Sequence, residues 1–279
     1  MPVPKTPFFV TDFVTWNLTP RGEALRRHDA YFVSYPKSGR TWVRFFYYSY
    51  LTRLTGRASF SWNPADFPGH PAVAFEHDRW TQRMKNPWWR RLAGRDLIPP
   101  DVRTRRPVIL MARDPRDVVV SHYFHLLKRE NDIGWTRMPL AEMIRDPRFG
   151  LPHIVERLNA WRAEWENTVP FLCMRYEDCQ AEPVREFRSL LQFLGAPVDE
   201  SVLKATVDYC RFENMQAMEA SGTFEDEALR ATDPRDVDSY KARRGKVGGF
   251  RDHFSPEDLA YAAGVLQQLD PRYGYRAES

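Results

Sequence analysis

Short, uniformly apolar runs recur along the chain, and each is followed by a polar or loop-like stretch. The clearest runs span residues 31–35, 72–75, 107–112 and 169–175. A strand that is apolar at every position is typical of a parallel sheet buried on both faces. Because segments with helical periodicity follow most of these runs, the pattern predicts an α/β fold in which helices flank a parallel sheet on both faces.

The helical segments carry recognisable start and stop signals. Asp114 can cap a helix whose first residue is Pro115, and Gly195 can end another. One predicted helix begins near residue 40. The others span residues 115–128, 158–168, 184–194 and 256–269. No linker rich in proline, glycine or serine divides the chain, so we expect one domain over residues 1–279.

Two long regions lack a clear period. Residues 55–100 contain many aromatic side chains, and a loop of that length inside a domain is usually functional. Residues 213–245 are polar and are followed by glycines. We expect the second region to be a lid that orders over a bound anion, with a disordered segment as the alternative.

Residues 35–42 read Tyr-Pro-Lys-Ser-Gly-Arg-Thr-Trp, between a predicted strand and a predicted helix. Pro36 favours the end of the strand, and Gly39 permits a sharp turn. The amides of residues 38–41 would then lie at a helix N-terminus beside the ammonium of Lys37 and the hydroxyl of Thr41. Such a site binds a phosphate-like anion, whereas the alternative is a surface turn with an incidental lysine.

The order of residues in this loop also bears on the kind of nucleotide chemistry. In the usual phosphate-binding loop, the lysine follows the second glycine. Lys37 instead precedes Gly39, which argues against an ordinary ATPase or GTPase.

Four chemically active side chains fall at the ends of predicted strands: Lys37, His77, Arg113 and Tyr176. The carboxyl ends of parallel strands meet at one edge of a sheet, where ligands of α/β proteins bind. The sequence therefore predicts that these residues share a site.

The net charge is +4 and the basic residues are scattered, so the chain is not expected to bind nucleic acid. Its three cysteines show no paired spacing, which fits a reducing compartment and excludes a cysteine-based zinc site. Neither a signal peptide nor a run of about 18 apolar residues is visible. We expect a cytoplasmic protein that requires no metal. Contact of Trp88 and Trp89 with an anionic membrane is a further hypothesis, with an inward-packed loop as its alternative.

Three motifs, in order, resemble those of the soluble sulfotransferases that use 3′-phosphoadenosine 5′-phosphosulfate (PAPS) and have a P-loop-like α/β fold. Residues 35–42 resemble the 5′-phosphosulfate loop, which usually has threonine where this chain has Arg40. Residues 113–121 resemble the 3′-phosphate motif, and residues 243–254 resemble the third signature, where Arg-Lys-Gly is more common than Arg-Arg-Gly. The resemblance covers nearly the whole chain.

The resemblance implies a role for each matching residue. Lys37 would stabilise charge on the departing adenosine 3′,5′-bisphosphate (PAP), Arg113 and Ser121 would bind the 3′-phosphate, and His77 would be the general base. Catalytic residues would then be His77, Lys37 and Ser121. Nucleotide contacts would come from Lys37, Ser38, Gly39, Arg40, Thr41, Trp42, Arg113, Ser121, Tyr176, Phe212, Arg243, Arg244 and Gly245.

The identity of the base has a competitor one residue away. Glu76 precedes His77, and adjacent residues of a strand point to opposite faces, so only one can face the sulfuryl group. The lysine that many family members have two residues before the histidine is Phe75 here. Direct in-line transfer to an acceptor hydroxyl or amine needs a base and a stabilised leaving group, without a metal.

Two other functions remain open from the sequence: a P-loop-type nucleotide kinase and a catalytically inactive nucleotide-binding module. The acceptor is not specified either. The aromatic residues between 60 and 89 suit a phenol, a steroid, a lipid or a glycolipid equally well. The oligomeric state is likewise not predicted.

Overall fold

A computed structural model describes residues 27–77, 105–129, 138–221, 240 and 245–276. Its centre is a parallel sheet with the strand order β2-β1-β3-β4. The strands are β1 (Ala30–Ser34), β2 (Val73–Glu76), β3 (Val108–Ala112) and β4 (Phe171–Arg175). Each lies within a residue or two of an apolar run in the sequence, so the predicted parallel sheet is confirmed.

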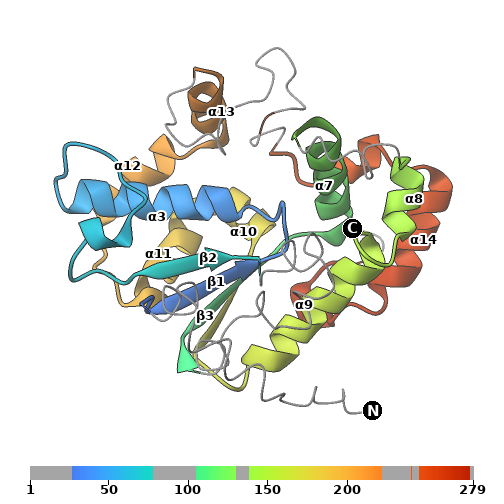
Figure 1. Cartoon of the computed structure of the whole chain (residues 1–279), viewed down its shortest axis with the longest axis horizontal. Helices are drawn as coiled ribbons and strands as arrows, with labels where there is room; N and C mark the ends of the chain where they lie inside the picture. Colours follow the sequence, from blue (N-terminus) through green and yellow to red (C-terminus); the bar gives the residue numbers. More distant parts are fainter. Residues whose placement is uncertain (1–26, 78–104, 130–137, 222–239, 241–244, 277–279) are drawn as a thin grey trace, which may run out of the picture.

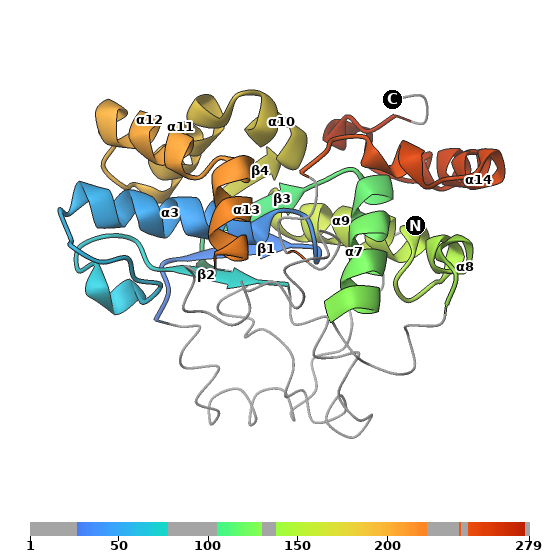
Figure 2. The same ribbon diagram turned by 90° about the horizontal axis from the view of Figure 1, so that it is seen from above.

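Helices cover both faces of this sheet, as Figures 1 and 2 show. One layer contains α3 (Arg40–Leu54), α11 (Pro183–Leu194) and α12 (Glu200–Tyr209). The other contains α7 (Pro115–Arg129), α8 (Leu140–Arg145), α9 (Leu151–Trp165) and α14 (Pro256–Leu266). The shorter elements are α10 (Tyr176–Ala181), α13 (Phe212–Ala220), η1 (Pro64–Asp66), η4 (Gly249–Asp252) and η5 (Pro271–Tyr273).

Each strand supplies side chains to two separate apolar cores. In β1, Tyr31 and Val33 pack with the α7–α9–α14 layer, whereas Phe32 packs with the α3–α11–α12 layer. Alternation of side chains along a strand produces this division. Burial on both faces explains why the strands are apolar except at their last residue, which is Ser34 in β1, Glu76 in β2 and Arg175 in β4, whereas β3 is apolar throughout.

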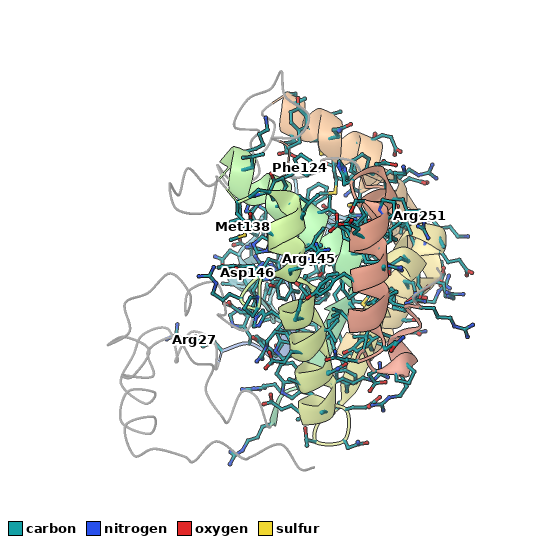
Figure 3. All side chains as sticks on the ribbon, turned by 90° about the vertical axis from the view of Figure 1, so that its right-hand side faces the viewer. Arg27, Phe124, Met138, Arg145, Asp146 and Arg251 are labelled. Atoms are coloured by element: carbon teal, nitrogen blue, oxygen red, sulfur yellow. The ribbon has the colours of Figure 1, made fainter. Side chains whose placement is uncertain are left out.

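The C-terminal part of the chain is bound to the layer formed by α8 and α9 (Figure 3). The guanidinium of Arg145, at the end of α8, donates to the carboxylate of Asp258 in α14. Asn159 of α9 donates to the carbonyl of Gln268 over 2.7 Å, and its side-chain oxygen accepts from the Asp270 amide over 2.9 Å. The last described segment is therefore part of the same fold as the sheet.

Several predicted boundaries are wrong. Helix α9 begins at Leu151 rather than 158, because Leu151 and Ile154 extend its buried face and a proline occupies its first turn. The acidic residues after β4 lie in the first turn of α10, where carboxylates favour a helix N-terminus. The final helix ends at Leu266, three residues early.

Four helices of the described residues were not predicted: α8, α10, α12 and α13. Asp199 caps α12 by accepting from the amides of Ser201 and Val202, a signal that is present in the sequence. Helix α13 occupies the first part of the region predicted to be a lid. The remainder, residues 222–239 and 241–244, lies outside the described residues, as do Trp88 and Trp89 of the membrane hypothesis.

Among the described residues, no helix combines the length and the apolar character needed to cross a membrane.

Candidate active site

The loop between β1 and α3 has the strained geometry of an anion-binding turn. Lys37 has φ 71° and Gly39 has φ 100°, both in the left-handed region. A Cβ atom at Gly39 would lie 2.7 Å from Cδ2 of Tyr176, so only glycine fits there. A lysine with positive φ costs on the order of 1–3 kcal/mol, and such strain is concentrated at functional sites.

The loop presents hydrogen-bond donors at the start of α3. The first amides of a helix have no intrahelical acceptor, and the first turn of α3 contains no acidic residue that could neutralise its positive end. Ser38 differs from expectation, because its amide closes the turn by donating to the Tyr35 carbonyl over 3.2 Å. The Ser38 hydroxyl is buried and has no partner within the described parts of the chain.

Arg113 connects all three motifs. It follows β3, and its Nη1 donates to the Lys37 carbonyl over 3.0 Å while Nη2 donates to the Lys246 carbonyl over 3.3 Å. Its guanidinium lies 4.3 Å from the ring centroid of Tyr176. Its Nε is buried and has no hydrogen-bond partner in the described ranges, so it remains a donor for an anion.

Aromatic side chains form one wall beside this loop. Trp42 lies edge-on to Tyr176 with 5.9 Å between ring centroids, and its Nε1 donates to the Cys210 carbonyl over 2.8 Å. Cys210 precedes Phe212, the first residue of α13. A Cβ atom at Gly245 would lie 2.6 Å from the Phe212 ring, so the third motif packs directly against that ring.

Tyr176 itself is held in place at this wall. Its hydroxyl accepts from Nε2 of Gln180 over 2.9 Å, and burial raises the pKa of the phenol above its ordinary value. The side chain is therefore a neutral hydrogen-bonding group at physiological pH.

His77 stands directly after β2 and contacts the neighbouring strand. Its Nδ1 lies 2.8 Å from the carbonyl oxygen of Ser34, the last residue of β1. A carbonyl can only accept, so Nδ1 donates in this contact, and Nε2 is the nitrogen that accepts a proton when the ring is neutral. This is the tautomer that a general base requires. Lys37 lies three residues after Ser34 in the loop that continues β1. The end of β1 therefore contacts the histidine and leads directly into the loop.

The predicted placement of Lys37, His77, Arg113 and Tyr176 at the carboxyl edge of the sheet is confirmed, because β1, β2, β3 and β4 end just before them. Ser121 lies half-buried on α7, eight residues after Arg113. Arg243 and Arg244 lie outside the described residues. The roles of all these residues stay predictions.

The structure adds acidic residues that sequence reasoning did not place in the site. The carboxylate of Asp117 accepts from the amides of Gly248 and Phe250 over 2.7 and 2.9 Å. Glu177 accepts from the Asp114 amide over 2.9 Å and from the Tyr275 hydroxyl over 2.7 Å. These contacts span up to 133 residues, and no local pattern identifies them.

No cluster of three or more histidine, cysteine, aspartate or glutamate side chains suited to a metal ion occurs among the residues that the structure describes.

Comparison with known proteins identifies the class. Residues 27–269 match the family described as "Sulfotransferase domain". The chain therefore belongs to the sulfotransferase family, a family of transferase enzymes, as its three motifs indicate.

Curated relatives support this membership over most of the chain. Flavonol 3-sulfotransferase of Flaveria bidentis is 25% identical over 247 residues, which cover 82% of this chain and 78% of that protein. Cytosolic sulfotransferase 16 of Arabidopsis thaliana is 27% identical over 271 residues, covering 87% and 76%.

Solved structures share the fold. Mouse sulfotransferase SULT7A1 complexed with PAP aligns with a TM-score of 0.57 at 16% identity, over 86% of this chain and 84% of that one. Retinol dehydratase in a complex with retinol and PAP aligns with a TM-score of 0.54 at 18% identity, over 91% and 82%. The P-loop-like α/β fold predicted from the sequence is thus confirmed.

Proposed function

We propose that this protein transfers the sulfuryl group of PAPS to the hydroxyl of a small-molecule acceptor, with His77 as general base. The observation that carries the proposal is the pair of hydrogen bonds that connect the candidate groups: His77 to the Ser34 carbonyl and Arg113 to the Lys37 carbonyl. These bonds connect the candidate base and the candidate 3′-phosphate arginine to β1 and to the 5′-phosphosulfate loop that follows it. The PAP complexes named for the two structural neighbours support the choice of donor.

At the nucleotide end, the 5′-phosphate would bind to the amides at the start of α3 and to the hydroxyls of Ser38 and Thr41. The buried Nε of Arg113 has no partner in the described ranges and would bind the 3′-phosphate together with Ser121. Trp42, Tyr176 and Phe212 would contact the adenosine, and Arg243, Arg244 and Gly245 would close over the 3′-phosphate.

At the reacting end, Nε2 of His77 removes the acceptor's hydroxyl proton while the acceptor oxygen forms a bond to sulfur. On the opposite side of the sulfur, the bond to the bridging oxygen of PAPS breaks, and PAP leaves with that electron pair. The ammonium of Lys37 stabilises the charge that develops on the bridging oxygen. Protein groups alone supply the acid–base and electrostatic assistance in this scheme, and no metal is required.

The names of the relatives support a hydroxyl-bearing small molecule as acceptor. They include flavonol sulfotransferases of two Flaveria species, and one structural neighbour is in complex with androsterone. Several curated relatives are named cytosolic, which supports a cytoplasmic location for this protein.

The proposal is tested by incubating the protein with ³⁵S-labelled PAPS and a panel of flavonols, simple phenols, steroids and fatty alcohols. Transfer of label with release of PAP is the expected result. Binding of PAP without transfer to any acceptor would favour the inactive nucleotide-binding module. Transfer of phosphate from ATP instead would favour the kinase.

His77 is tested against Glu76 with two substitutions. His77→Ala should reduce turnover by at least about 100-fold, in the range expected for a lost general base, while PAP affinity stays near that of the wild type. Glu76→Gln should cost much less, and wild-type turnover should fall at acidic pH as the imidazole becomes protonated. If Glu76→Gln is the inactive variant and His77→Ala retains most activity, the base is Glu76 and the acceptor is more consistent with a sugar hydroxyl.

A further inference from the structure

Arg40 makes a side-chain contact that the proposed nucleotide site does not use. It is the first residue of α3, and its Nη1 donates to the backbone carbonyl of Phe75 over 2.9 Å. Phe75 belongs to β2, 35 residues further along the chain. A threonine, the usual residue of similar loops at this position, has too short a side chain to span from the start of a helix to a neighbouring strand in this way.

The guanidinium is a largely buried charge with a definite counter-charge. Burial lowers the pKa of Arg40 to about 10, and the nearby carboxylate of Glu76 opposes that shift. With this pKa the side chain stays cationic at neutral pH. A buried charge that lacks hydrogen bonds and an opposite charge is strongly unfavourable. Arg40 has the hydrogen bond to the Phe75 carbonyl, and attraction to the Glu76 carboxylate offsets part of the cost of burial.

His77 directly follows the last residue of β2. The last paired residue of this short strand is Glu76, opposite Val33, so the strand ladder stops one residue before the histidine. Arg40 fixes the backbone at Phe75, two residues before the imidazole, while the Ser34 carbonyl fixes Nδ1 of the ring. One contact therefore holds the main chain and the other holds the side chain.

From this geometry we infer that Arg40 is a positioning residue for His77, acting through the Phe75 carbonyl. The inference rests on the proposed function. It assigns the Arg40 side chain to the base, and leaves only its backbone amide to the 5′-phosphate. The loop that binds the donor and the strand that carries the base would thus be held in register by one side chain.

The packing of β2 indicates that the strand survives loss of this contact. The Phe75 ring lies 5.0 Å from the Phe32 ring, and it also approaches Tyr47 and Tyr48 of α3 with centroid distances of 6.5 and 6.3 Å. Aromatic packing therefore holds the strand independently of Arg40. A variant without the guanidinium should fold, with a less well-oriented histidine.

The test compares Arg40→Thr and Arg40→Lys with Arg53→Thr. Arg53 is a matched control, because it lies on the same helix, α3, and its guanidinium covers the Tyr209 ring at 4.1 Å. Arg40→Thr should lower kcat by about 10- to 100-fold, as small misplacements of reacting groups do. PAP affinity and the KM for PAPS should stay close to wild type. Arg40→Lys, which keeps a charge and a donor, should recover part of kcat, and Arg53→Thr should keep it.

The outcomes separate this inference from the proposed function. An active wild type with an equally active Arg40→Thr variant overturns the positioning role and leaves the proposed function standing. Equal losses of kcat and PAP affinity, without recovery in Arg40→Lys, also overturn it, because they indicate a role in the nucleotide loop. A wild type that transfers sulfate to no acceptor refutes the proposed function itself, and PAP binding by the variants then does not bear on His77.

Discussion

Two strand–loop–helix junctions lie next to each other at the candidate site, because β1 and β3 are neighbouring strands, and they differ in how the helix N-terminus is used. At the β1–α3 junction the first turn of the helix contains no acidic residue, and the buried Ser38 hydroxyl has no partner in the described parts of the chain. At the β3–α7 junction, Asp114 and Asp117 are both buried acids. Asp114 pairs with Arg116 over 2.7 Å, and Asp117 accepts two amides of the segment 248–250.

The difference teaches that a helix N-terminus is an anion site only if the chain leaves it unneutralised. In α7 the positive end of the helix is already balanced by carboxylates, which use their remaining acceptor capacity to bind other parts of the protein. The β3–α7 junction is therefore structural, and its expected contribution to the nucleotide comes from side chains, Arg113 and Ser121. The β1–α3 junction offers its backbone as well.

The largest effect should come from a substitution at the β1–α3 junction. Lys37→Ala should lower kcat, because the activation free energy should rise by about 2–4 kcal/mol, the contribution of one preorganised donor at a developing charge. PAP affinity should change much less, because that charge develops mainly in the transition state. Steady-state kinetics and calorimetric titration of PAP measure the two quantities. Lys204→Ala, an exposed lysine of α12, is the control; unchanged kcat in Lys37→Ala would contradict the assignment.

An intermediate effect should come from a substitution of Arg113, which lies at the β3–α7 junction. The wild type should prefer PAPS to adenosine 5′-phosphosulfate, and Arg113→Ala should remove about 1.5–3 kcal/mol of that preference, the range for a hydrogen bond to a charged group. The ratio of kcat/KM for the two donors is an internal control, because loosening of the loops affects both donors. Equal use of both donors by the wild type would mean that the 3′-phosphate motif has been misread.

The smallest effect concerns the carboxylate of Asp117. Burial raises its pKa, while Arg113 and the amides of Gly248 and Phe250 oppose that shift. Because the pKa is raised in the folded state, the stability that this carboxyl contributes is fully present below its unfolded value, near 3.9, and is lost as pH rises through the folded value. Asp117→Asn cannot ionise.

The free energy of unfolding of the wild type, relative to Asp117→Asn, should therefore fall by about 1 kcal/mol or less between pH 4 and pH 7. Urea denaturation of both proteins across that range measures it. Parallel pH profiles would show that the titration of Asp117 is not coupled to folding.

The sheet and the edge that carries the site were predictable, because they depend on local signals. The buried run before Arg113 and the Pro36–Gly39 turn each specify their own geometry. With parallel strands, the topology rule then places Lys37, His77, Arg113 and Tyr176 together. Helix α12 was equally predictable from its Asp199 cap and was overlooked.

The contacts that organise the site were not predictable, because their partners are distant in sequence. Nothing near Asp117 indicates that its carboxylate accepts from Gly248, and nothing near Arg40 indicates that its side chain donates to the Phe75 carbonyl. Both depend on how elements pack, and local periodicity does not encode that. The predicted start of α9 was wrong for a related reason, because the burial of Leu151 depends on its neighbours in the core.

The contacts of Arg113 have a consequence for how this protein can vary during evolution. Both of its acceptors, at Lys37 and Lys246, are main-chain carbonyls, which persist whatever side chain those positions carry. Among the residues that the structure describes, the ammonium of Lys246 forms an exposed pair with Asp252 over 2.8 Å, an interaction of little energetic value. Mutational drift at position 246 should therefore be tolerated, whereas a change at position 113 removes the donors to two loops at once. Constraint is concentrated on the arginine, and the side chain at position 246 is free to diverge.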